Sequence, residues 1–335
     1  MRAPGFWSDP QSLAGHLLSP LGAAVGALTL RRMAKPGLRA PLPVVCVGNP
    51  TVGGSGKTPA TRMVVRRLAD AGHRPAVLTR GYGGSLKGPV VVDAARHGAA
   101  EVGDEALLHA ASGLTVLAHD RPAGAALAAA QGATVIVMDD GFQNPSLVKD
   151  LSLLVVDGAA GLGNGRILPA GPLRAPFAPQ MARADALLVV GPGAAADALA
   201  AAVAAGGDTV IRARLAPDPA IAAWLAGRDV LAFCGIGRPA KFVETLGAAG
   251  ARNAVLRPFP DHHAYVDADA RQLLDEAART GLALVTTEKD RVKLKGSAAL
   301  DELAARTVTV PVQLVPADPA ALDRLIAPVS RPPVP

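Results

Sequence analysis

The chain has 335 residues, of which half are hydrophobic and only 3% aromatic, and its formal net charge is +6. This length is sufficient for one large α/β domain and a smaller one with its own buried core. The basic residues are mostly arginine, and the aromatic side chains that stack on single-stranded nucleic acid are scarce. We therefore expect no nucleic-acid partner, whereas the positive surplus suits phosphate-rich or anionic membrane partners.

The N-terminal part of the chain contains an apolar segment at 13–30, which is followed by a basic cluster at 31–39. Polar residues and Pro20 interrupt this segment, and a membrane span needs about 20 mostly apolar residues. A signal peptide is not expected, because the basic cluster follows the apolar run instead of preceding it. Two alternatives remain open: an interfacial helix that rests its apolar face in the headgroup region of a membrane, or an ordinary helix packed on the domain surface.

Between residues 41 and 191, short apolar segments alternate with segments of helical periodicity. Each apolar segment is hydrophobic on both of its faces, which is typical of a parallel sheet covered by helices on both faces. Strands are expected at 41–49, 74–84, 90–92, 114–118, 133–141, 151–158 and 184–191. Helices are expected at 59–71, from residue 104 onward, and at 123–131.

A second α/β set follows an almost featureless stretch of alanine and glycine at 194–207. Residues 209–215 are expected to form a connecting strand. Further apolar segments lie at 228–239, 282–290 and 308–316, before a final helix. The sequence therefore predicts a membrane-associating segment at 1–40, a core domain at 41–208 and a smaller α/β domain at 209–335.

The most specific motif is the glycine-rich segment TVGGSGKT at 51–58, which lies between an expected strand and an expected helix. Backbone amides of such a P-loop surround phosphate groups at a helix N-terminus, where the helix dipole favours negative charge. We expect its lysine to reach the β- and γ-phosphates of ATP and its last threonine to bind Mg²⁺. The nucleotide-binding residues are then Thr51, Val52, Gly53, Gly54, Ser55, Gly56, Lys57 and Thr58. The predicted fold class is a P-loop NTPase-like parallel sheet plus a second, smaller α/β domain.

Two pairs of acidic residues are candidates for catalysis and metal binding. Asp139 and Asp140 end an apolar strand, where folds of this type hold Mg²⁺, although Asp-Asp-Gly is also a common turn. Asp104 and Glu105 begin an expected helix, where acids often act only as N-terminal caps. His262 belongs to the segment FPDHH, which by itself is expected to be a loop. A kinase that acts on a hydroxyl needs a carboxylate or imidazole near it, and Asp104 supported by His262 would supply one.

Seven motifs in this order make the chain resemble the tetraacyldisaccharide 4′-kinase family of lipid A biosynthesis. They are VGNPTVGGSGKTP (47–59), TRGYGG (79–84), VGDE (102–105), DDGFQN (139–144), LPAGPLR (168–174), FPDHH (259–263) and TEKDRVK (287–293). The family normally carries threonine at the first position of its P-loop, as this chain does, and it usually has histidine where this chain has Asn144. The resemblance covers most of the chain. It implies ATP-dependent phosphorylation of the 4′-hydroxyl of a tetraacylated glucosamine disaccharide 1-phosphate.

The resemblance also implies roles for individual residues. Asp104 would be the base, tuned by His262, and Lys57 would complete the catalytic set. The residues implied around Mg²⁺ are Thr58, Asp140, Glu105 and Asp139. The residues implied for the substrate phosphate and the cleft are Arg174, Arg121, Arg80 and Tyr82. The implied location is the cytoplasmic face of a bacterial inner membrane, which favours the interfacial helix, and we expect a monomer.

Two other functions are compatible with the P-loop. A nucleotide switch or ATPase with a GGxGKT loop typically carries a lysine just before the paired glycines, where this chain has Val52. That function also leaves the FPDHH segment and the apolar N-terminal segment unexplained. A soluble small-molecule kinase is the second alternative, and in it the N-terminal segment would serve only for packing.

Overall fold

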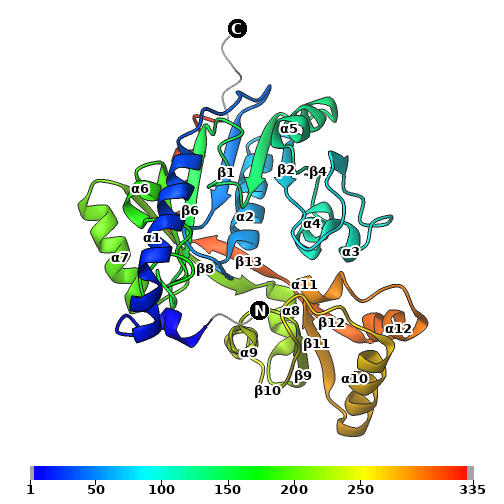
Figure 1. The fold of residues 1–335 in the computed structure, drawn as a ribbon. Coiled ribbons are helices and arrows are strands. Elements are labelled where there is room, and N and C mark those ends of the chain that lie inside the picture. Colours follow the sequence, from blue (N-terminus) through cyan, green and yellow to red (C-terminus); the bar gives the residue numbers. More distant parts are fainter. Residues whose placement is uncertain (1–3, 330–335) are drawn as a thin grey trace.

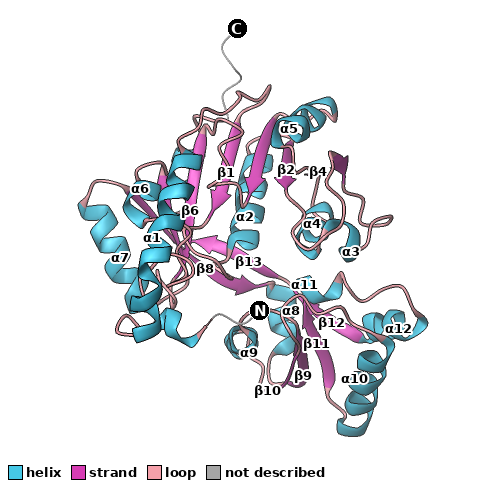
Figure 2. Ribbon diagram, in the orientation of Figure 1, coloured by secondary structure: helices cyan, strands magenta, loops and turns pink. Residues whose placement is uncertain are grey.

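The computed structural model describes residues 4–329, which form two β-sheets, each with helices on both faces (Figures 1 and 2). The larger sheet has nine strands, and all of them run parallel except the two edge strands. In spatial order they are β13 (Val312–Pro316), β8 (Thr209–Pro217), β7 (Ala186–Val190), β6 (Leu151–Asp157), β1 (Val44–Gly48), β5 (Val135–Asp139), β2 (Pro75–Thr79), β4 (Thr115–Leu117) and β3 (Val90–Val91). The predicted fold class is confirmed.

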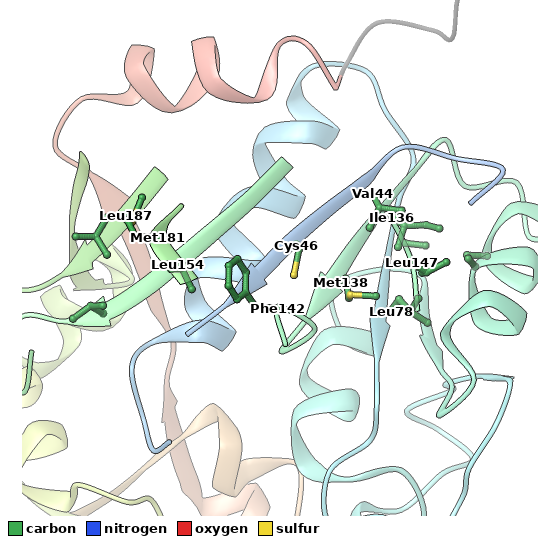
Figure 3. Close-up of a cluster of buried hydrophobic side chains, with 14 of the residues drawn as sticks. Val44, Cys46, Leu78, Ile136, Met138, Phe142, Leu147, Leu154, Met181 and Leu187 are labelled. Carbon is green, nitrogen blue, oxygen red and sulfur yellow. The ribbon is translucent and has the colours of Figure 1, made fainter. Parts of the chain in front are cut away.

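The central strand β1 shows why these segments are apolar throughout, since successive side chains of a strand point to opposite faces. Val44 and Cys46 belong to the hydrophobic cluster on one face, and Val45 and Val47 belong to the cluster on the other. Figure 3 shows Val44 and Cys46 within the first cluster. Burial raises the pKa of the Cys46 thiol to about 12, so this cysteine acts as a small hydrophobic residue.

Helices cover both faces of the larger sheet. One face is covered by α5 (Arg121–Ala130), α6 (Phe177–Met181) and α7 (Ala194–Ala205), the other by α2 (Lys57–Asp70) and α13 (Pro319–Ile326). The short helices α3 (Ala99–Val102) and α4 (Asp104–Ala110) pack beside β4. The alanine-rich stretch without an assignment from sequence is therefore the helix α7.

The N-terminal segment forms a short 3₁₀ helix, η1 (Gly5–Ser8), and the 21-residue helix α1 (Leu13–Met33). Pro20 lies inside α1 and does not end it. By length and composition alone, α1 could cross a membrane. Its buried residues are glycines, and a Cβ added at Gly22 would lie 2.7 Å from the carbonyl oxygen of Ile167. This close approach packs one side of α1 against the larger domain, while the other side stays exposed.

The smaller sheet has four parallel strands, in the order β10 (Asn253–Pro258), β9 (Asp229–Cys234), β11 (Ala283–Thr287) and β12 (Thr307–Val310). Helices α10 (Asp267–Thr280) and α12 (Ala298–Arg306) share a hydrophobic cluster on one face. Helices α8 (Pro219–Leu225) and α9 (Pro239–Ala248) share the cluster on the other face. The remaining element, α11 (Glu288–Arg291), follows β11 and contacts α4 of the larger domain.

The structure corrects the boundary expected at residue 209. Strand β8 pairs with β7 in the larger sheet, and β13 pairs with β8 in antiparallel orientation. The strand expected at 308–316 is two strands in two different sheets, with Pro311 between β12 and β13. The smaller sheet is thus an insertion between β8 and β13, and the chain returns to complete the larger sheet.

Candidate active site

The P-loop joins the end of β1 to the start of α2. Gly53 and Gly56 have φ values of 107° and 88°, in the left-handed region that favours glycine. A Cβ added at Gly54 would meet no other protein atom within 4 Å, so open space adjoins the loop at this point. Lys57 is the first residue of α2, and the free amides of a helix's first turn attract anionic groups. These features fit a phosphate site.

The segment LPAGPLR braces the P-loop from the side. The backbone N–H of Val52 donates to the carbonyl of Pro172 at 2.8 Å. The N–H of Arg174 donates to the carbonyl of Pro50 at 2.8 Å, and its Nε donates to the carbonyl of Thr51 at 3.2 Å. The sequence identified this segment as a motif, and the structure shows that it supports the loop and brings Arg174 to its edge.

Asp140 is the point at which the charged side chains of the P-loop region converge. The Arg174 guanidinium grips it with two hydrogen bonds, from Nη1 to Oδ1 at 2.9 Å and from Nη2 to Oδ2 at 3.1 Å. The ammonium group of Lys57 lies 3.8 Å from Oδ1 of the same carboxylate. The Asp140 side chain is 37% exposed, so its oxygens remain accessible to a ligand.

Asp139, by contrast, is enclosed by the protein. Its side chain is 2% exposed, and its two oxygens accept hydrogen bonds from Thr61 Oγ1 at 3.0 Å and from His109 Nε2 at 3.1 Å. Burial alone would raise the pKa of Asp139, but these hydrogen bonds and the charge of Lys57 hold it below its usual value. Because Asp140 is 37% exposed and Asp139 only 2%, Asp140 is the more accessible of the two acids to a metal ion.

The structure brings Asp104 and His262 together across the two domains. His262 Nδ1 lies 3.0 Å from Asp104 Oδ2, and Oδ1 of Asp104 accepts the backbone N–H of Glu105 at 2.9 Å. His262 has a φ of 59°, which is unusual for a residue other than glycine and directs the FPDHH loop toward α4. The ring of Tyr82, which is 70% exposed, lies 5.9 Å from that of His262.

This contact sets the protonation states of the pair. Burial would raise the pKa of Asp104, but the hydrogen bond from His262 and the charge of Lys289 lower it below its usual value. The same hydrogen bond raises the pKa of His262 above its usual value, against the effect of burial. Asp104 is therefore ionised at neutral pH and can accept a proton.

Lys289 is a site residue for which the sequence predicted no role. Its ammonium group lies 3.2 Å from Glu105 Oε1 and 3.9 Å from Asp104 Oδ2, and it comes from α11 of the smaller domain. The only signal in the sequence was its place in the motif TEKDRVK. Glu105, expected near Mg²⁺, is thus paired with a lysine in this structure.

Arg121 and Arg80 follow the carboxyl ends of neighbouring strands of the larger sheet. Arg121 begins α5 and is 3% exposed, and its Nη1 has no hydrogen-bond partner among residues 4–329. Burial lowers the pKa of Arg121, and nearby Asp139 and Asp140 act in the opposite direction. A buried guanidinium with an unpaired N–H next to the P-loop acids suits an anionic ligand. Arg80 is exposed after β2.

The donor set beside the P-loop fits Mg²⁺ bound together with a nucleotide. Within the described part of the chain, no three His, Cys, Asp or Glu side chains form a ready-made metal cage. Mg²⁺ in kinases takes one or two protein ligands and completes its shell with phosphate oxygens and water, so it does not need such a cage. The Thr58 hydroxyl and the accessible Asp140 carboxylate meet this requirement.

Two further ion-pair groups join the domains near the site. Both carboxylate oxygens of Glu288 of α11 accept hydrogen bonds from Arg62 Nη1 of α2, each at 2.8 Å. Asp157, at the end of β6, is 4% exposed and is paired with Arg238 and with Lys241, whose Nζ lies 2.8 Å away. Sequence analysis did not identify these contacts, because each joins segments that are far apart in the chain.

Comparison with known proteins agrees with this geometry. The family model described as tetraacyldisaccharide-1-P 4′-kinase (LpxK) matches residues 14–330. The tetraacyldisaccharide 4′-kinase of Azorhizobium caulinodans is 57% identical over 325 residues, which are 97% of this chain and 96% of that protein. The enzyme of the same name from Methylobacterium nodulans is 58% identical over 304 residues, 90% of each chain.

A solved structure shares the fold over nearly the whole length. The crystal structure of LpxK from Aquifex aeolicus in complex with ATP superposes with a TM-score of 0.73 at 25% sequence identity. The match covers 95% of this chain and 100% of that chain. On the family match, the high identity to these relatives and the shared fold, the chain belongs to the tetraacyldisaccharide 4′-kinase family.

Proposed function

We propose that this protein transfers the γ-phosphoryl group of ATP to the 4′-hydroxyl of a tetraacyldisaccharide 1-phosphate, a step of lipid A biosynthesis. Its curated relatives carry the name of this activity, and the related solved structure holds ATP. The observation that carries the proposal is the pairing of Asp104 with His262 at 3.0 Å, in a structure that also contains a P-loop. A nucleotide switch needs no such pair, whereas a kinase acting on a hydroxyl does.

In the proposed reaction, the 4′-oxygen attacks the γ-phosphorus of ATP while the bond to the β–γ bridging oxygen breaks and ADP leaves. The amides of residues 51–58 hold the phosphates, and Lys57 neutralises charge on the β- and γ-phosphates. Thr58 and Asp140 would hold Mg²⁺, with Glu105 and Asp139 as further members of the expected set. Mg²⁺, when bound, supplies positive charge to the transferred group.

Asp104 takes the proton of the attacking hydroxyl in this proposal. Its lowered pKa keeps the carboxylate ionised, and the hydrogen bond from His262 holds it in one orientation. Asp104 is 4% exposed, and His262 and Lys289 of the smaller domain lie against it. We infer that the acceptor hydroxyl enters when the two domains move apart and that their closure completes the site.

The arginines near the P-loop are assigned to anionic groups of the reactants. Arg174 and Arg121 would meet phosphate, because a guanidinium can donate two parallel hydrogen bonds to it. Arg80 and Tyr82 would line the cleft at the carboxyl end of β2. This assignment is supported by the unpaired buried Nη1 of Arg121 and by the position of Arg174 at the edge of the P-loop.

Helix α1 would place the protein on the cytoplasmic face of the inner membrane. Its side away from the domain carries leucines that are 55–73% exposed: Leu13, Leu17, Leu21 and Leu28. Its last turn carries Arg31 and Arg32, which suit anionic lipid headgroups. Because the glycine side packs on the domain, an interfacial position is favoured over a span.

Incubation with γ-labelled ATP and Mg²⁺, with and without tetraacyldisaccharide 1-phosphate in detergent micelles, tests the proposal. Label transfer that requires the lipid supports the 4′-kinase. Release of labelled phosphate at the same rate with and without the lipid would identify an ATPase instead. Label transfer to a water-soluble acceptor in a cell extract, with none to the lipid, would identify a soluble small-molecule kinase.

A further inference from the structure

A buried hydrogen-bonded chain connects the two helices that carry the catalytic groups. His109 lies on α4, five residues after Asp104, and Thr61 lies on α2, four residues after Lys57. Asp139, at the end of β5, accepts from both of them, at 3.1 Å from His109 Nε2 and at 3.0 Å from Thr61 Oγ1. We propose that this bridge sets the distance between the proposed base and the P-loop, and that His109 is a positioning residue for phosphoryl transfer.

The three bridging side chains are almost completely buried. His109 is 1% exposed, Thr61 is 0% exposed and Asp139 is 2% exposed. An ionised carboxylate can only accept hydrogen bonds, so His109 Nε2 carries the proton. His109 Nδ1 has no partner among residues 4–329. An apolar side chain at position 109 would avoid this unpaired nitrogen, so the contact with Asp139 is the interaction that accounts for a histidine here.

Helix α4 is short, and its polar side-chain contacts with the smaller domain come from its first two residues, Asp104 and Glu105. It has seven residues, of which Ala106 and Leu107 belong to a small hydrophobic cluster that also contains Leu117 of β4. It begins after Gly103, which has a φ of 82°. The bond to Asp139 fixes the C-terminal part of this short helix, so its removal allows α4 to shift. Since Asp104 is its first residue, such a shift moves the base.

The expected consequence is a loss of turnover with little loss of nucleotide binding. Displacing a catalytic group by about 1 Å can lower a rate about 100-fold. The P-loop itself is held by β1, α2 and the segment around Pro172, so nucleotide affinity does not depend on His109. The inference rests on the proposed function for its kinetic consequence, and on the contacts alone for its structural one.

The test compares His109→Leu, which removes the donor, with His109→Gln, whose amide can replace Nε2–H as a donor to Asp139. Leu107→Ala is the matched control, because it weakens the packing of the same helix and leaves the bridge intact. Turnover on the lipid acceptor, the dissociation constant of ATP with Mg²⁺ and the hydrogen exchange of the α4 amides are measured for each. Thr61→Val, which deletes only the hydroxyl, tests the bridge from α2 if His109→Leu does not fold.

His109→Leu is expected to lower kcat about 10- to 100-fold, to change the ATP dissociation constant less than about threefold, and to speed exchange in α4. His109→Gln is expected to restore most of kcat and most of the protection of the α4 amides from exchange. Leu107→Ala is expected to keep most of kcat. Equal losses of kcat in His109→Leu and Leu107→Ala would overturn the proposal, as would unchanged exchange in α4. If the wild type transferred no phosphate to lipid, the proposed function would fail, and the exchange data would still decide on the bridge.

Discussion

His262 Nδ1 lies 3.0 Å from Asp104 Oδ2, although the two residues are 158 positions apart and come from different sheets. Asp104 is held by α4 at the edge of the larger sheet, and His262 by a loop after β10 of the smaller one. Each domain therefore contributes one residue of the proposed catalytic pair: the larger domain contributes the proton acceptor Asp104, and the smaller domain contributes His262, which donates a hydrogen bond to it. The relative position of the domains decides whether the pair exists.

Asp104→Ala is expected to lower turnover by about 10²- to 10⁴-fold, the usual contribution of a general base, with little effect on ATP binding. The reason is that its proposed task lies in the transition state and not in nucleotide binding. Lipid phosphorylation and calorimetric titration with ATP and Mg²⁺ measure the two effects. Asp261→Asn is the matched control, since Asp261 lies 3.9 Å from the other nitrogen of His262. Near-normal turnover in Asp104→Ala would contradict the assignment of the base.

The raised pKa of His262 predicts a pH-dependent contribution to stability. The folded state favours the protonated ring because Asp104 accepts its hydrogen bond. This stabilisation is complete below the usual histidine pKa of 6.5 and is lost as the pH rises through the raised value. The melting temperature of His262→Gln should fall below that of the wild type by more at about pH 6 than at about pH 9. A difference in melting temperature between the two proteins that stays constant or widens at the higher pH would contradict this prediction.

The strands and the P-loop could be predicted from the sequence because their signals are local. The fully apolar segments became the strands β1, β2, β5, β6 and β7, and TVGGSGKT became the loop before α2. The link between Asp104 and His262 rested on the needs of a hydroxyl-directed kinase and on the resemblance to a known family, since nothing local joins residues so far apart. The TEKDRVK motif was recognised, but the contact of Lys289 with the acids of α4 depends on how the domains meet.

The parts that sequence analysis missed depend on pairing between distant segments. Strand β8 appeared to open a new domain, but it extends the larger sheet because β13 returns to pair with it from Val312 onward. A strand has the same local pattern whichever sheet it joins, so this boundary could not be read from the sequence. Sequence analysis likewise assigned no role to His109, which the fold places against Asp139.

Lys289→Met is expected to lower the free energy of unfolding by about 1–3 kcal/mol, because it leaves partly buried carboxylates of α4 without their cation. Its ammonium group lies 3.2 Å from Glu105 and 3.9 Å from Asp104, and its side chain is 21% exposed. Turnover should fall as well, since the smaller domain is held less firmly against α4. Urea denaturation and the lipid assay measure these effects. Lys295→Met is the control, because the Lys295 ammonium group donates to the backbone carbonyls of Ala94 and His97 and, among residues 4–329, to no carboxylate. Equal losses in both variants would count against the prediction.

Replacing Leu13, Leu17 and Leu21 by serine is expected to weaken binding to vesicles that contain anionic lipid by at least about tenfold. These side chains are 55–73% exposed on the side of α1 that faces away from the domain. ATP binding should not change, because α1 does not contact the P-loop through these leucines. Co-sedimentation with vesicles measures the effect. Val266→Ser, at an exposed apolar residue far from α1 in the sequence, should bind vesicles as the wild type does, and unchanged binding of the triple variant would exclude α1 as the membrane contact.

The most direct measurement follows label from γ-labelled ATP into tetraacyldisaccharide 1-phosphate and into the same lipid with its 4′-hydroxyl replaced by hydrogen. The wild-type protein should label the first lipid in a reaction that needs Mg²⁺, and it should leave the second unlabelled. The Lys57→Ala protein should label neither while remaining folded. Label in the deoxy lipid, or ATP hydrolysis without any lipid labelling, would contradict the transfer of phosphate from this P-loop to the 4′-hydroxyl.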